Sequence, residues 1–149
     1  MGADGGRRTA PLLTPADLVY LGVDETKATV WEREQVQALS ISVVSQADVV
    51  ADPAGAARQA RSLLSAGPFA VHVDVDVLDF IDAPLAENVN GRNSGPTIDQ
   101  LGLALSELLQ HPDCWAVSIG QLVPAHASAD ATAIPRLIAA LAAPPPASA

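Results

Sequence analysis

The chain reads Val71-His72-Val73-Asp74-Val75-Asp76-Val77-Leu78-Asp79 near its middle, and this stretch decides the fold prediction. Valines alternate with His72, Asp74 and Asp76, which is the pattern of a β-strand with one buried face. On such a strand the three polar side chains point to the same side, roughly 6–7 Å apart. Two aligned carboxylates repel each other in a dry site unless a cation or a proton lies between them. The stretch therefore indicates a metal site; the alternative is a polar strand face at a sheet edge, either solvated or paired with arginine.

Strands and helices alternate on both sides of this stretch. We expect strands at Leu18–Val23, Ile41–Val44, Pro68–Val75 and Trp115–Ile119. We expect helices at Thr29–Leu39, Ala54–Ala66, from Thr97 (with Gln100 completing a capping box) and at Asp130–Leu141. The apolar stripe of the helix from Thr97 consists of Ile98, Leu101, Leu105, Leu108 and Leu109. Trp31, Val36 and Leu39 are the inward positions expected for the first helix. This alternation predicts an α/β protein, a three-layer αβα domain with a mainly parallel sheet, whose ligands gather at the carboxyl ends of the strands.

Composition limits the domain count and the partners. With 149 residues, we expect one α/β domain at residues 17–142, a flexible tail at 1–16 and a disordered Pro/Ala tail at 143–149. A net charge of −9 argues against nucleic acid and anionic membrane as partners. A single cysteine, Cys114, excludes an internal disulfide and fits a reducing compartment. No signal peptide or membrane span is visible, so we expect a soluble, cytoplasmic protein.

The motif Asp74-x-Asp76-x-x-Asp79, between an apolar strand and a Pro/Gly/Asn-rich loop, resembles the second metal motif of the arginase/agmatinase/formiminoglutamase (ureohydrolase) family. The flanking segments resemble that family too: Leu18–Asp24, Asp79–Asn88, Gly91–Thr97, Trp115–His126 and Asp130–Thr132. The resemblance covers about residues 17–142 and corresponds to the carboxyl-terminal half of a typical member. It implies a truncated arginase-like fold.

The resemblance also implies a reaction and a cofactor. Members of the family hold two Mn²⁺ ions and a bridging hydroxide that attacks the guanidinium or amidine carbon of a small-molecule substrate, releasing urea or a related amide. Hard cations of this kind favour oxygen ligands. By resemblance, Asp74 would bridge both ions and Asp76 would bind one of them. Asp79 would orient the loop, and His72 would lie behind the metal ligands or simply pack.

Substrate recognition is implied for three further residues. Asn88 and Asn90 would lie where relatives read the tail of the substrate, although a solvated loop explains them equally well. Gln121 stands where relatives carry the Glu that pairs with the cationic substrate. Glutamine keeps the hydrogen bonds of glutamate but loses the charge-assisted term.

Two hypotheses follow for function. The family's other ligands, one His and an Asp-x-His-x-Asp cluster, lie in an amino-terminal half with no counterpart in this sequence. The chain is therefore either a working part of a ureohydrolase, completed by a separate amino-terminal polypeptide or by a homo-oligomer, or a non-catalytic remnant or binding module with a partial metal site. For the isolated chain we favour the second. Because half a sheet exposes an apolar edge, we also expect self-association or poor solubility.

Overall fold

A computed structural model describes residues 12–87, 93–128 and 130–142. In chain order the elements are η1 (Pro15–Asp17), β1 (Val19–Val23), α1 (Val30–Leu39), β2 (Ser42–Ser45), α2 (Gln46–Ala51), α3 (Pro53–Leu63), β3 (Phe69–Asp74), η2 (Val75–Val77), α4 (Ile98–Leu109), β4 (Cys114–Gly120), α5 (Pro124–Ala127) and α6 (Ala133–Ala142). Every strand and helix expected from the sequence is present, with ends shifted by a few residues. The helices α2 and α5 and the two 3₁₀ turns were not expected. The expected tails lie largely outside the described residues, although η1 falls at the end of the amino-terminal one.

All the paired strands run parallel, which confirms the α/β prediction. β1 pairs with β2, and β3 pairs with β4. Within the described part of the chain the four strands form two separate two-stranded sheets, and β1 is not hydrogen-bonded to β3. The register of the second sheet places His72 opposite Ser118 and Asp74 opposite Gly120.

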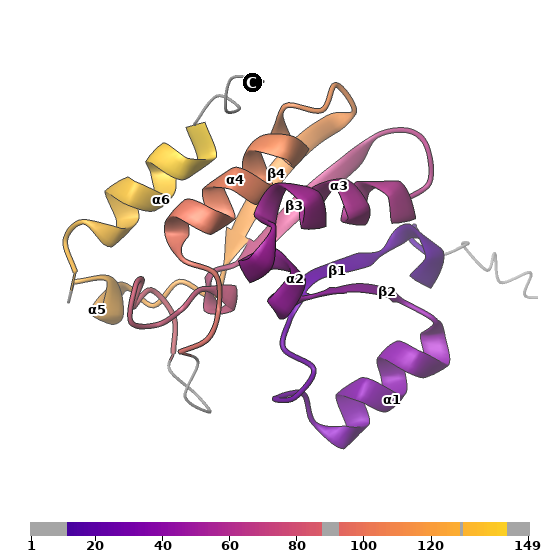
Figure 1. Cartoon of the computed structure of the whole chain (residues 1–149), viewed down its shortest axis with the longest axis horizontal. Coiled ribbons are helices and arrows are strands. Elements are labelled where there is room, and N and C mark those ends of the chain that lie inside the picture. The colour runs from indigo at the N-terminus through magenta and orange to yellow at the C-terminus, as the bar shows by residue number, and fades with distance from the viewer. Residues whose placement is uncertain (1–11, 88–92, 129, 143–149) are drawn as a thin grey trace, which may run out of the picture.

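Helices lie on both sides of the strands (Figure 1). On one side α3 contacts β1, β2 and α4, and α4 contacts α6. On the other side of β1 and β2 lies α1, which begins with a capping box between Thr29 and Glu32 but contains no buried residue. The expectation that Trp31 and Leu39 face inward is wrong, because they are 68% and 48% exposed. Val36, the third residue expected to face inward, is half-buried, so α1 covers little of its apolar side.

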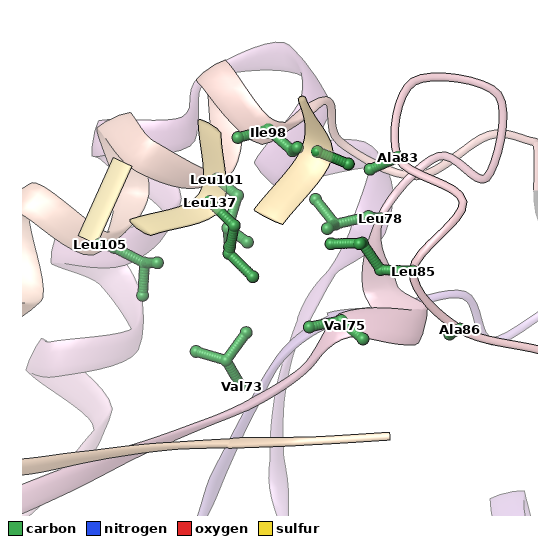
Figure 2. Close-up of a cluster of buried hydrophobic side chains, with 11 residues drawn as sticks. Val73, Val75, Leu78, Ala83, Leu85, Ala86, Ile98, Leu101, Leu105 and Leu137 are labelled. Atoms are coloured by element: carbon green, nitrogen blue, oxygen red, sulfur yellow. The ribbon is translucent and has the colours of Figure 1, made fainter. Parts of the chain in front are cut away.

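The main core lies between β3, the loop that follows it, α4 and α6 (Figure 2). Its buried side chains include Val73, Val75, Leu78, Leu85, Ile98, Leu101, Leu105 and Leu137. The helix stripe predicted for α4 supplies three of these residues, and its predicted Thr97–Gln100 capping box is confirmed. Pro135 lies in the first turn of α6, where its missing N–H costs no helical hydrogen bond.

The stretch at residues 71–79 is a strand only as far as Asp74. The amide of Leu78 then donates to the carbonyl of Val75 at 3.3 Å, which closes the 3₁₀ turn η2. Gly95 lies directly on this turn, because a Cβ atom at Gly95 would fall 2.2 Å from the Val77 carbonyl oxygen. The prediction that Asp76 continues the strand face of His72 and Asp74 is therefore wrong. A tight turn packed against Gly95 takes the place of the last strand residues.

The described residues contain no helix long and apolar enough to cross a lipid bilayer.

Candidate functional site

His72, Asp74 and Ser118 form a hydrogen-bonded row on one face of the β3–β4 sheet. The Nδ1 atom of His72 lies 2.7 Å from the Ser118 hydroxyl, and its Nε2 atom lies 3.1 Å from Oδ1 of Asp74. These residues share a face because strand side chains alternate and the parallel register pairs residue 72 with 118. The His72 and Asp74 side chains are 60% and 46% exposed, so the row is open to solvent.

Gly120 leaves room for this row. A Cβ atom at Gly120 would lie 2.7 Å from Oδ1 of Asp74 and 3.1 Å from Nε2 of His72. The next residue, Gln121, is exposed and has a φ of 62°, a left-handed conformation that is uncommon outside glycine. Asp74 and Gly120 are paired and are the last residues of β3 and β4. Gln121 therefore follows β4 at the same end of the sheet where Asp76 follows β3.

Asp76 and Asp79 lie beyond the end of β3. Asp76 belongs to η2, at the carboxyl end of β3 and beside the cleft that His72 and Asp74 also line. Asp79 caps its own loop: Oδ1 accepts from the Ile81 amide at 2.8 Å, and the Asp79 amide donates to the Pro96 carbonyl at 3.0 Å. Asn88 and Asn90, the predicted substrate-tail residues, lie outside the described residues.

A second polar cluster lies at the carboxyl ends of β1 and β2, where its members Asp24, Lys27 and Gln46 line the same cleft. Lys27 Nζ lies 3.7 Å from Asp24 Oδ2 and donates to the Ser94 hydroxyl at 3.4 Å. The Ser94 hydroxyl in turn donates to Gln46 Oε1 at 3.3 Å. Donation from the Thr26 hydroxyl, with a smaller contribution from Lys27, lowers the pKa of Asp24. Sequence reasoning missed this cluster, which joins segments 67 residues apart in the chain.

The loop after Asp79 is fixed by an ion pair that sequence reasoning also missed. Arg136 of α6 donates to both carboxylate oxygens of Asp82, at 3.0 and 3.3 Å, and to its carbonyl at 3.3 Å. Asp82 also accepts from the buried amide of Ile98 at the start of α4, at 2.8 Å. Hydrogen bonding to Asp82 raises the pKa of Arg136. His126, a histidine without ligand spacing in the sequence, bonds the Ala86 carbonyl through Nδ1 at 2.8 Å.

The arrangement fits part of a metal site. Asp74 and Asp76 reach the same cleft with hard oxygen ligands, but Oδ1 of Asp74 is engaged by His72. Among the described residues, no group of three or more His, Cys, Asp or Glu side chains is placed to hold an ion. These residues alone therefore do not fit the binuclear manganese centre that the family resemblance implies.

The fold is that of solved ureohydrolases. Superposition on the arginase of Bacillus subtilis gives a TM-score of 0.72 at 20% sequence identity, over 89% of this chain and 46% of that one. The chain has an arginase-like fold. The arginase of Bacillus caldovelox gives a TM-score of 0.71 at 20% identity, over 89% of this chain and 45% of that one. The formiminoglutamase of Trypanosoma cruzi, solved with Mn²⁺, gives 0.72 at 15% identity, over 87% and 43% of the two chains.

These likenesses confirm the arginase-like prediction at the level of the fold. The chain spans about half the length of the arginases and formiminoglutamases it matches. No protein-family model matches the sequence, and no curated protein matches it significantly.

Proposed function

We propose that this arginase-like chain supplies one part of a manganese-dependent ureohydrolase site, with Asp74 and Asp76 as its carboxylate ligands. The observation that carries the proposal is the placement of both carboxylates beside one cleft, at the carboxyl end of β3, in a fold shared with arginases. Carboxylates in such a position suit Mn²⁺, which prefers oxygen ligands. The remaining ligands come from outside the described residues. The completed site would hydrolyse a guanidino or amidino C–N bond.

A second candidate is a non-catalytic arginase-like module that keeps the fold and the partial metal site. Gln121 favours it, because a neutral amide occupies the position where the family resemblance implies a glutamate facing the cationic substrate. An amide still donates and accepts hydrogen bonds there, but it gives no charge-assisted bond to a guanidinium group. The two candidates differ in activity and share the metal ligands.

Manganese titration followed by electron paramagnetic resonance tests the shared part. We expect the isolated chain to bind Mn²⁺ weakly, and the double variant Asp74→Asn/Asp76→Asn to lose that binding. Asp99→Asn is the matched control, because its side chain is 88% exposed and lies on the helix layer. If the double variant binds Mn²⁺ as well as the parent chain, Asp74 and Asp76 are not ligands and the proposal fails.

Urea release from arginine and agmatine separates the two candidates. We expect no turnover from the isolated chain, because its ligand set is incomplete. Turnover after a complementing polypeptide is added would select the enzyme part. Its continued absence in a complex that holds Mn²⁺ tightly would select the non-catalytic module, and Gln121→Glu would then be the variant expected to restore substrate binding. Tight binding of two ions and turnover by the isolated chain would contradict the incomplete site.

A further inference from the structure

One large cleft, of about 1900 Å³, runs along β1 and β3. All residues from Val19 to Asp24 and from Phe69 to Asp74 line it. The cleft also touches Leu101 and Leu108 of α4 on one side of the strands and Trp31 of α1 on the other. Because α4 and α1 lie on opposite sides of the strands (Figure 1), the cleft passes through the plane of the sheets, between β1 and β3.

The strands that border this cleft point the same way. Gly22, near the carboxyl end of β1, lies against Val77, just after the carboxyl end of β3. Each strand is already paired on its outer side, β1 with β2 and β3 with β4. The two inner edges therefore face each other in parallel orientation without hydrogen-bonding to one another. An unpaired strand edge is a template for pairing with a further strand.

We propose that the cleft accepts a further β-strand, which pairs with β1 on one side and with β3 on the other and joins the two sheets into one. Neighbouring strands lie about 4.8 Å apart, so β1 and β3 would flank the added strand at roughly 9.6 Å. The contact between Gly22 and Val77 opens to admit it. An added strand would also lie between the apolar surface of α4 and helix α1, which has no buried residue, and would give that helix more surface to cover.

The chemistry of the cleft indicates which polypeptide can supply the added strand, here called the strand donor. A strand covered on both sides by helices is apolar almost throughout, so the strand donor is an α/β polypeptide with a short Val/Ile/Leu-rich segment. Residues 1–11 contain three glycines, two arginines and a proline, a composition that strands disfavour. A second copy is disfavoured as well, because it adds another net charge of −9 and brings its own Asp24, Asp74 and Asp76 to an already acidic cleft end.

The lengths of this chain and the arginases point to the same strand donor. The chain aligns over 89% of itself but over only 46% of the Bacillus subtilis arginase, so more than half of that protein has no counterpart here. The inference deepens the proposed function and rests on it in one respect: the added strand belongs to the polypeptide that completes the metal site. Since the added strand runs parallel to β3, its carboxyl end arrives beside Asp76.

Co-expression tests the proposal. The probe is the portion of the Bacillus subtilis arginase that this chain does not match, produced as a separate polypeptide together with the full 149-residue chain and without added metal. We expect a one-to-one complex by size-exclusion chromatography with light scattering. Hydrogen exchange should slow at Val19–Val23 and Phe69–Asp74, and the outer strands β2 and β4 should change less.

Two matched variants locate the binding edge. Ala70 and Ala116 are exposed, lie opposite each other in the β3–β4 register, and differ in that Ala70 borders the cleft. We expect Ala70→Arg to weaken the complex about tenfold or more, and Ala116→Arg to change it less than about twofold. Circular dichroism melts of both variants alone check that each remains folded to the same extent.

Four results would overturn the proposal: no complex, a complex without slower exchange in β1 and β3, equal weakening by both arginines, or a dimer of the chain alone whose β1 and β3 are already protected. The last result would make a second copy the occupant. Each readout is independent of manganese, so failure here leaves the titration of Asp74 and Asp76 standing, and failure of that titration leaves the strand experiment standing.

Discussion

Replacing Asp82 by alanine should destabilise the protein more than any exposed ion-pair change. The carboxylate accepts from the Ile98 amide at 2.8 Å and from Arg136 at 3.0 and 3.3 Å. Ile98 is fully buried at the first turn of α4, where the amides have no helical partner. Loss of this acceptor resembles loss of an N-cap, at about 1 kcal/mol. The ion pair is about a quarter to a third exposed, so after screening it adds roughly 0.5–1 kcal/mol.

The total is about 2 kcal/mol, which for a domain of this size corresponds to a fall in Tm of roughly 6 °C. Urea denaturation followed by circular dichroism gives the free energy of unfolding directly. Asp82→Asn keeps an acceptor for Ile98 and should lose less than half of the alanine effect. Glu107→Gln is the control, because its pair with Arg58 is at the surface and should contribute under about 0.5 kcal/mol. Equal losses for Asp82→Asn and Asp82→Ala would show that the Ile98 amide does not need this acceptor.

Three further changes test local features of the fold. Gly95→Ala should cost more than about 2 kcal/mol in unfolding free energy, because the new Cβ would meet the Val77 carbonyl oxygen at 2.2 Å; a stable variant would mean that η2 moves freely. Ser40→Gly should stabilise by roughly 0.5–1 kcal/mol, since Ser40 ends α1 with a φ of 53°, and an unchanged melting curve would argue against strain there. The pKa of Asp24 is lowered in the folded state, so its contribution to stability is present above the unfolded pKa and declines as the pH falls through the folded pKa. Thr26→Val removes the hydroxyl donor and should raise the pKa of Asp24, measured by carbon-detected NMR titration. An unchanged pKa would show that the Thr26 hydroxyl is not the cause.

Local sequence signals predicted most of the elements. The stripe of Ile98, Leu101 and Leu105 identified a helix whose apolar face is buried, and the capping pair at Thr97 identified where it begins. Alternation correctly placed His72 and Asp74 on one strand face. It failed at Asp76 because a period of two continues through Val75 and Val77, while the backbone closes a turn there against Gly95.

The remaining features depend on contacts that no local pattern carries. Asp82 and Arg136 are 54 residues apart, and neither lies in a motif that predicts the other. The amphipathic pattern of α1 is real, but none of its residues is buried. A helical pattern shows which side is apolar and cannot show whether a surface exists to cover it. For the same reason the sequence predicted parallel strands but not their division into two sheets.

Gly120 also affects how this sequence can vary. It is partly open to solvent, and positions of that kind usually tolerate most amino acids. A single methyl group at this position would nevertheless strike both His72 and Asp74. Because both side chains are exposed and can move aside, substitutions at residue 120 in a saturation library should leave the protein folded but disturb the pairing of His72 with Asp74. Genetic drift at this surface site would be limited by the neighbouring imidazole and carboxylate rather than by packing.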